Sequence, residues 1–138
     1  MTENTIISTD KDCLDITMIH AYLSEQSYWA KGRSLDTVKK SIENSLCFGL
    51  YNQQGQQLGF ARVATDYAVF GWLMDVFVLE EYRRQGLGKK LIEFVVNHPD
   101  IKILRRIGLA TSDAHGLYRQ FGFCPVSSPE KMMELVHT

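Results

Sequence analysis

The feature that most constrains the fold is a largely apolar run, Val69 to Leu79, that leads into a turn containing arginine and glycine. A run of this kind is typical of a central strand that is covered on both faces. The turn, Arg83 to Gly88, opens a helix pattern whose apolar residues recur on one side: Leu87, Leu91, Ile92 and Val95. This segment predicts an α/β or α+β domain of mixed sheet with helices on both faces.

The hydrophobic pattern of the rest of the chain changes between a helical and an alternating period. It predicts five further strands, at Thr5–Ser8, Leu46–Tyr51, Leu58–Thr65, Ile103–Thr111 and Met132–Val136. It also predicts two early helices capped by Asp12 and Ser34, and a short one over Ala114–Gln120. The helix that carries Leu87 should stop at Asn97-His98-Pro99, because a residue that precedes proline disfavours the helical conformation.

Composition limits the class of protein. A chain of 138 residues, 45% of them hydrophobic, is expected to form one domain over residues 1–138. Its formal charge of −1 argues against a nucleic-acid partner, since such domains are usually strongly basic. Neither a membrane span nor an export signal is recognisable. Cys13, Cys47 and Cys124 are scattered and form no Cys-x-x-Cys pair, which argues against a metal site and favours a cytoplasmic location.

The turn itself predicts an anion site. The first N–H groups of a helix have no partner within the helix, and the helix dipole adds positive charge there. Glycines allow an anion to approach that backbone closely, and Arg83, Arg84, Lys89 and Lys90 add cationic donors. A phosphate or pyrophosphate is therefore the expected ligand. The nucleoside-triphosphatase and dinucleotide patterns are both disfavoured, because they require glycine where Arg83 and Leu91 stand.

Two motifs resemble one family. Arg83-Arg84-Gln85-Gly86-Leu87-Gly88 is similar to the Arg/Gln-x-x-Gly-x-Gly/Ala signature of the GNAT superfamily of N-acetyltransferases. The later Ala114-His115-Gly116-Leu117-Tyr118, followed by Gly122-Phe123, resembles the second signature of that family. The expected order of elements matches the family as well. The resemblance implies a mixed, mostly antiparallel sheet of six to seven strands flanked by about four helices.

The resemblance also implies a cofactor, acetyl-coenzyme A, and direct transfer of its acetyl group to an amine. The residues that would bind the cofactor are Phe77, Val78, Arg83, Arg84, Gln85, Gly86, Leu87, Gly88 and Lys89. Within this set the two strand residues would pair with the pantetheine arm through their backbone, and the turn would hold the pyrophosphate. A β-bulge near Asp75 to Phe77 is expected from the family, because it would open the sheet for the thioester.

Tyr118 matches the usual general acid of the family, and a phenol can donate a proton or a hydrogen bond to a thiolate leaving group. The alternative is a tyrosine that packs the last helix against the sheet. A base for the incoming amine is less well specified. Asp75, His115 and Asp66 are candidates, and a chain of water molecules is a fourth. Asp75 is the choice for the catalytic pair, because a carboxylate in an apolar strand must be paired or must face the cleft, and the alternative is a carboxylate that is hydrogen-bonded to loop amides.

The acceptor site is expected to be built from the loop between the first two helices and the strand that precedes the central one. Aromatic faces suit amine cations, so Tyr28 and Trp29 are predicted to form one wall. Asp66, Tyr67 and Phe70 are predicted to form the opposite wall, with His115 nearby. Trp29 could instead be a hydrophobic plug under its loop.

The expected function is therefore acetyl-CoA-dependent N-acetylation of a primary amine on a small molecule or a protein. The alternative is a CoA-binding sensor or interaction domain of the same fold without turnover. No membrane or nucleic-acid partner is expected, and the protein is expected to be a monomer or a homodimer.

Overall fold

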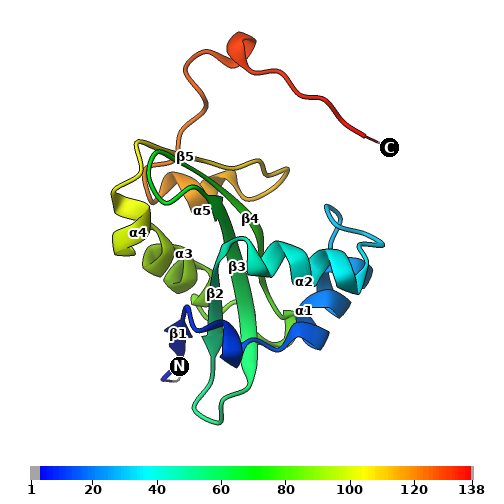
Figure 1. Cartoon of the computed structure of the whole chain (residues 1–138). Helices are drawn as coiled ribbons and strands as arrows, with labels where there is room; N and C mark the ends of the chain where they lie inside the picture. Colours follow the sequence, from blue (N-terminus) through cyan, green and yellow to red (C-terminus); the bar gives the residue numbers. More distant parts are fainter. Residues whose placement is uncertain (1–3, 138) are drawn as a thin grey trace.

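The computed structural model describes residues 4–137 of the chain and shows one mixed sheet at the centre of the molecule (Figure 1). Its strands are β1 (Ile6–Ser8), β2 (Leu46–Tyr51), β3 (Gln57–Thr65), β4 (Phe70–Val78) and β5 (Arg106–Gly108), in the order β1-β2-β3-β4-β5. Neighbouring strands are antiparallel except β4 and β5, which are parallel. The mostly antiparallel sheet is confirmed. The expected number of strands is not confirmed, since the described residues form five strands and not six or seven.

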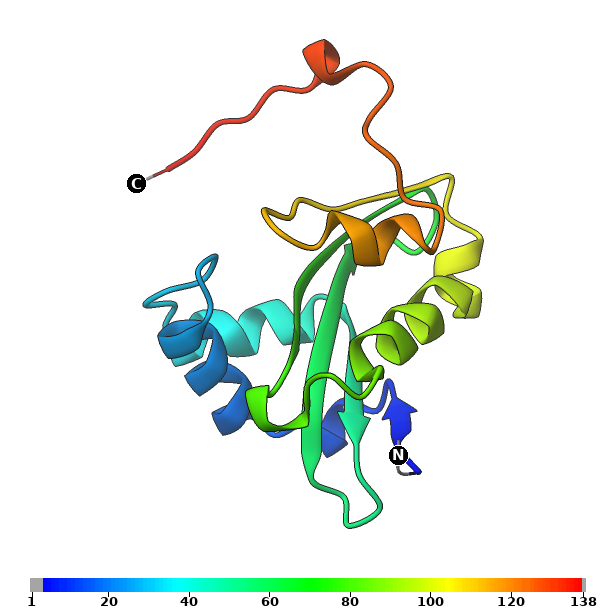
Figure 2. The same cartoon turned by 180° about the vertical axis from the view of Figure 1, so that it is seen from behind.

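The described residues form five α-helices, which cover the two faces of the sheet (Figures 1 and 2). They are α1 (Ile16–Ala21), α2 (Leu35–Glu43), α3 (Leu87–Asn97), α4 (Pro99–Lys102) and α5 (His115–Arg119). A π-helical turn, Tyr22–Gln26, continues α1, and single 3-10 turns occur at Lys11–Cys13, Glu80–Tyr82 and Pro129–Lys131. One core cluster joins α1 and α2 to the sheet, and a second joins α3, α4 and α5 to the opposite face. Helices on both faces are therefore confirmed.

The caps explain where the early helices begin. Ser34 caps α2 as predicted, since its hydroxyl accepts a hydrogen bond from the Thr37 backbone N–H at 3.2 Å. The predicted cap at Asp12 is wrong. Leu14 has an extended backbone that separates the first 3-10 turn from α1, so α1 is capped by Asp15, which accepts from the Met18 N–H at 3.1 Å.

A β-bulge bends β4, as expected. Phe60 of β3 pairs with Phe77, and Arg62 pairs with Met74, so Asp75 and Val76 together face a single residue of β3. Asp75 has a φ of 57°, a left-handed backbone that is rare for residues other than glycine. The bulge therefore turns this part of β4 away from a regular ladder.

Strand β5 is much shorter than its predicted range, Ile103–Thr111. It pairs with β4 only from Phe70↔Arg106 to Trp72↔Gly108. The chain then diverges from β4, so the edge of β4 beyond Trp72 has no strand partner on this side within residues 4–137. The divergence leaves space between the two segments, and this space positions the candidate site.

The predicted closing strand, Met132–Val136, is wrong. Residues 124–137, which we call the C-terminal arm, leave the domain after Phe123 and contain no strand (Figures 1 and 2). A short, mostly apolar run is compatible with an extended backbone, but a strand also needs an edge with which it can pair. Separately, none of the helices within residues 4–137 has the length and apolarity that a membrane crossing requires.

Candidate active site

The Gly-rich turn leads from β4 into α3 through two left-handed residues. Arg84 has a φ of 66° and Gly86 a φ of 78°, and Gly86 is the N-cap of α3. The first intrahelical bond runs from the Lys90 N–H to the Gly86 carbonyl at 3.0 Å. Only glycine adopts the left-handed conformation without strain, which explains why this residue type stands at the start of the helix.

The N-terminus of α3 is open. A Cβ atom placed on Gly86 or Gly88 would meet no other atom within 4 Å. Among residues 4–137, none accepts a hydrogen bond from the N–H of Gly86, Leu87 or Gly88. The side chains of Arg84 and Lys89 are exposed on either side. The donors, the positive end of the helix and the free space together fit a phosphate group.

Arg83 has a different environment from the one predicted. Its Nε donates to the Val78 carbonyl at 2.8 Å, and its Nη2 donates to the Tyr22 hydroxyl at 2.7 Å. Tyr22 in turn stacks on Phe77 with ring centroids 4.0 Å apart. Arg83 therefore braces the turn against the end of β4, and the predicted phosphate contact of its side chain stays a prediction. The same holds for the backbone roles of Phe77 and Val78, whose side chains are buried.

A cavity of about 460 Å³ occupies the space where β5 ends. Residues 72–76 of β4 form one side, and residues 109–114 after β5 form the other. Tyr28, Trp29 and Arg33 from the loop between α1 and α2 complete the lining together with Tyr118 of α5. The cavity thus follows from the bulge in β4 and from the early end of β5.

Asp75 lies in this wall with 3% of its surface exposed, and three side chains donate hydrogen bonds to its carboxylate. Oδ1 accepts from the Trp29 indole at 2.9 Å, whereas Oδ2 accepts from Arg33 and from Arg62, each at 2.9 Å. Arg62 also donates to the Ser45 hydroxyl at 3.0 Å. This network ties the α1–α2 loop to the sheet. The general-base role of Asp75 stays a prediction, and the two ion pairs argue against it, because a proton would have to displace a guanidinium.

Tyr118 lines the cavity and is 8% exposed. Its ring packs edge-on against Phe123, with centroids 5.7 Å apart. No residue within 4–137 forms a hydrogen bond with its hydroxyl. Burial, with smaller contributions from Tyr28 and Asp113, raises the pKa of Tyr118 to about 12. The phenol therefore keeps its proton at neutral pH.

Tyr28 and Trp29 both line the cavity, as predicted for the aromatic wall. Their rings meet edge to face, with centroids 5.0 Å apart. The Tyr28 hydroxyl accepts a hydrogen bond from the Ser112 N–H at 3.2 Å, so the α1–α2 loop bridges the cavity to the segment after β5. Hydrogen bonding with Ser112 lowers the pKa of Tyr28. Trp29 is 38% exposed and is therefore more than a buried plug.

The predicted opposite wall is corrected by the structure. Asp66 and Tyr67 belong to the β3–β4 turn, Phe70 is the first residue of β4, and none of the three lines the cavity. Asp66 accepts hydrogen bonds from three N–H groups of its own turn, which lower its pKa, so it fixes that turn. His115 is exposed at the start of α5 and also lies outside the lining.

Sequence reasoning missed three residues of the site: Arg33, Arg62 and Trp72. The signal for the ion pairs was present. Arg62 is a charged residue in the middle of an otherwise apolar strand, and Asp75 interrupts the next strand in the same way. Since a buried charge must be paired, two opposite charges on adjacent predicted strands predict an ion pair between them. No comparable signal distinguishes Trp72 from other strand aromatics.

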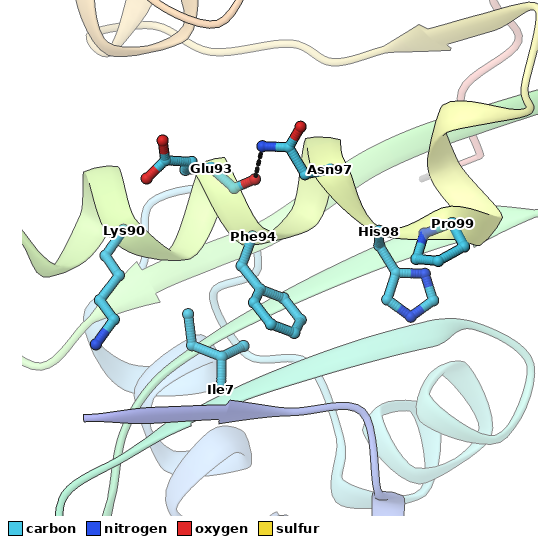
Figure 3. A pocket seen from close by; sticks show the side chains of 7 residues that line it. All are labelled: Ile7, Lys90, Glu93, Phe94, Asn97, His98 and Pro99. Atoms are coloured by element: carbon cyan, nitrogen blue, oxygen red, sulfur yellow. Dashed lines mark hydrogen bonds between the residues drawn. The ribbon is translucent and has the colours of Figure 1, made fainter. Parts of the chain in front are cut away.

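A second depression, of about 420 Å³, lies between β1 and α3 (Figure 3). Its lining includes Ile7 of β1 and, from α3, Lys90 and Phe94. Lys90 already donates to the backbone and side-chain oxygens of Thr5, and Asn97 donates to the Glu93 carbonyl at 2.8 Å. None of the predicted catalytic or acceptor residues lies there, so the cavity beside β4 is the better candidate.

Comparison with known proteins agrees with this geometry. The family model for the acetyltransferase (GNAT) domain matches residues 43–125. A Xanthomonas campestris pv. campestris crystal structure, described as belonging to the GNAT family, is 47% identical with a TM-score of 0.95, and the match covers 99% of this chain and 96% of that one. A Gibberella zeae protein that carries the name of an acetyltransferase is 29% identical over 82% of this chain and 75% of its own length.

A more distant crystal structure shares the fold. The Clostridium acetobutylicum protein, solved with acetyl-CoA, is 15% identical with a TM-score of 0.68, and the match covers 96% of this chain and 95% of that one. The family match spans more than half of the present chain and includes both the open N-terminus of α3 and Tyr118. This chain belongs to the GNAT family of acetyltransferases.

Proposed function

We propose that this protein is an acetyl-CoA-dependent N-acetyltransferase that acts directly on a primary amine of a small molecule or a protein. The observation that carries the proposal is the position of β4 between two features. Residues 72–76 of β4 line the cavity beside Tyr118, and its end at Val78 leads into the open N-terminus of α3. An elongated cofactor with a diphosphate at one end and a thioester at the other matches that arrangement.

The turn would hold the diphosphate through backbone N–H groups of Gln85 to Lys89, with Arg84 and Lys89 as exposed cationic partners. Arg83 would keep the turn in place through its bonds to Val78 and Tyr22. Acetyl-CoA supplies an acetyl thioester, whose C–S bond breaks as the C–N bond to the amine forms. The acetyl-CoA complex of the Clostridium acetobutylicum protein, which shares the fold, supports this cofactor.

Tyr118 would stabilise the sulfur that departs. A phenol with a pKa near 12 is a weaker acid than an ordinary thiol, whose pKa is about 8.5. Full proton transfer to the thiolate is therefore unfavourable, whereas a hydrogen bond to the developing negative charge is favourable. We accordingly assign Tyr118 the role of a hydrogen-bond donor in the cavity.

The amine would enter beside the Tyr28–Trp29 pair, where aromatic faces attract a cation. Of the candidate bases, Asp75 is occupied by three donors and His115 lies outside the cavity lining. Asp66 is occupied by its own turn. The arrangement favours the remaining alternative, in which water molecules carry the proton away from the ammonium.

Cofactor binding can be tested by thermal unfolding with acetyl-CoA. At about 100 times its Kd, a ligand stabilises the folded state by about 2.7 kcal/mol, so the Tm should rise by several degrees. Gly88→Glu should abolish this rise, because its carboxylate would stand beside the phosphate site. Gly55→Glu is the control for the charge change: Gly55 is also open but lies in the turn between β2 and β3, and because its φ of 83° strains any side chain, the rise is measured from that variant's own Tm without ligand. An equal loss in both variants would contradict the assignment.

Turnover can be tested by thiol release with a broad panel of amines, with the acetylated product identified by mass. Tyr118→Phe should lower kcat about 100-fold while the Kd for acetyl-CoA changes little. Tyr82→Phe removes a hydroxyl outside the cavity lining and should retain full activity. A wild-type protein that binds acetyl-CoA but acetylates no amine would favour the alternative, a CoA-binding sensor.

A further inference from the structure

The ion-pair network around Asp75 contains more positive than negative charge. Arg33 and Arg62 both donate to the same carboxylate oxygen, Oδ2. Because arginine is always protonated in proteins, two guanidiniums against one carboxylate leave a formal charge of +1. Neither arginine has another ion-pair partner within residues 4–137. A charge that is largely removed from water is favourable only beside a counter-charge, so the network is suited to one further anionic group.

Arg33 is the arginine of this network that reaches the cavity. Its side chain is 21% exposed and lines the cavity, whereas Arg62 is not part of the lining. A guanidinium has five N–H donors, and Arg33 uses Nη1 for Asp75. Among residues 4–137, no acceptor is bonded to its Nε or Nη2, and neither nitrogen is buried away from solvent. Two adjacent donors of this kind fit a carboxylate or a phosphate.

The backbone of Arg33 is held in place on both sides. Its N–H donates to the Ala30 carbonyl at 3.0 Å, and its own carbonyl oxygen lies 3.1 Å from Nε2 of His20. The next residue, Ser34, is the cap of α2. A guanidinium on a fixed backbone, with one nitrogen already bonded to Asp75, loses little further conformational entropy when it binds an anion.

The cavity lining contains a second carboxylate, which does not neutralise Arg33. Asp113 belongs to the segment after β5, is exposed, and forms no ion pair within residues 4–137. Its negative charge contributes to the raised pKa of Tyr118, so its field reaches the hydroxyl beside which the thiolate would depart. An acceptor with an ammonium group at one end and an anion at the other matches these two charges.

Size and charge narrow the class of acceptor further. The cavity volume of about 460 Å³ lies within the range of small-molecule sites. A polyamine or a basic peptide would bring a second positive charge to Arg33, which is unfavourable. An amine that also carries an anionic group would instead neutralise the network.

We propose that Arg33 binds an anionic group of the acceptor, and that the acceptor is a small amine that also carries a carboxylate or a phosphate. This assignment rests on the proposed N-acetyltransferase function and specifies its substrate class. Arg33 would contribute to binding and not to the chemical step, because the anionic group lies away from the amine that attacks the thioester. Loss of the contact should therefore raise KM more than it lowers kcat.

Matched pairs of acceptors test this assignment in the wild-type protein. β-Alanine is compared with 3-aminopropanamide, and 2-aminoethyl phosphate with ethanolamine, at saturating acetyl-CoA. In at least one pair, kcat/KM for the anionic amine should exceed that of its neutral partner about tenfold or more. The pair with the larger ratio distinguishes a carboxylate from a phosphate. A wild type without this preference in either pair, or one that acetylates only neutral or cationic amines, would overturn the assignment.

Arg33→Gln should remove the preference, mainly through KM, so that the two kcat/KM values of a pair become similar. The variant should fold, because glutamine can still donate to Asp75 and Arg62 remains its ion-pair partner; circular dichroism and the Tm rise with acetyl-CoA check this. Arg119→Gln removes an exposed arginine of α5 outside the lining and should keep the wild-type ratio. A preference that persists in Arg33→Gln, or that is lost in both variants, would refute the role of Arg33.

Calorimetry without turnover separates a failure at Arg33 from a failure of the proposed function. The probe is 3-hydroxypropanoate, which has the carboxylate of β-alanine but no amine. Its binding to the wild type should be lost in Arg33→Gln and kept in Arg119→Gln. If no amine is acetylated but this pattern is found, the anion site stands and the transferase function is refuted. If amines are acetylated but the three proteins bind the probe equally, the anion site is refuted and the transferase function stands.

Discussion

The two ends of the candidate site are built in different ways. The turn at the start of α3 is one continuous stretch, and its donors are backbone N–H groups that the left-handed Gly86 exposes. The wall around Asp75 is assembled from side chains of three distant segments, the α1–α2 loop, β3 and β4. A local motif therefore specifies the turn at the start of α3, whereas only the tertiary fold assembles the wall around Asp75.

The difference implies that the two ends respond differently to mutation. Changes at Gly86 or Gly88 should alter ligand binding with a smaller effect on stability, because a side chain added there would meet no other atom within 4 Å. Changes at Asp75 should act first on stability, because they leave charges buried without partners. Three experiments test this contrast.

The largest effect is expected for Asp75→Ala. This change leaves Arg62, which is 7% exposed, and the mostly buried Arg33 side chain without a counter-charge. Breaking a buried ion pair costs about 3–5 kcal/mol in the free energy of unfolding, measurable by urea titration. Glu93→Ala removes an exposed carboxylate from α3 and serves as the control. A loss at Asp75 no larger than that of the control would remove the proposed contrast.

A smaller effect is expected from pH at Tyr118. The unfolded phenol ionises near pH 10, whereas burial raises its folded pKa to about 12. Its contribution to stability is therefore complete below pH 10 and declines between about pH 10 and pH 12, by about 1.4 kcal/mol per pH unit. Unfolding at pH 9 and pH 11 should show that Tyr118→Phe lacks this decline.

Tyr51→Phe is the matched control for that measurement. Burial raises the pKa of Tyr51 to about 12 as well, but this residue lies in β2 outside the cavity lining. Both variants should reduce the alkaline decline, and only Tyr118→Phe should reduce turnover. Equal turnover in the two variants would mean that Tyr118 has only a packing role.

The smallest effects, of opposite sign, are expected for alanine at the two glycines of the turn. Gly86→Ala forces a left-handed residue and should cost about 1 kcal/mol. Gly88→Ala lies inside the helix and should increase stability by about 0.5–1 kcal/mol, because alanine favours the helix. Urea unfolding measures both. If the free energy of unfolding changed with the same sign in both variants, the left-handed backbone of Gly86 would not distinguish the two positions.

The same contrast explains which parts of the molecule the sequence could predict. Strand β2 and the Ser34 cap of α2 depend on local patterns, and the prediction was accurate for both. The bulge followed from a family resemblance and is confirmed. The partners of Asp75 depend on the register of β3 against β4, which no local pattern specifies. The placement of Asp66 in the acceptor wall failed because its carboxylate satisfies the N–H groups of its own turn.

The C-terminal arm illustrates the limit most clearly. The apolar residues from Met132 to Val136 indicated a closing strand, but none of these residues belongs to a strand in the structure. A pattern of side chains does not identify the edge that such a segment pairs with, since that information lies in another part of the fold or in another molecule.

The lining of the cavity has a practical consequence for spectroscopy. The chain contains two tryptophans, and both Trp29 and Trp72 belong to that lining. All of the indole fluorescence therefore originates beside the candidate active site, with one emitter hydrogen-bonded to Asp75. A molecule that enters the cavity changes the surroundings of both emitters, so the unlabelled protein carries its own optical signal for screening amines.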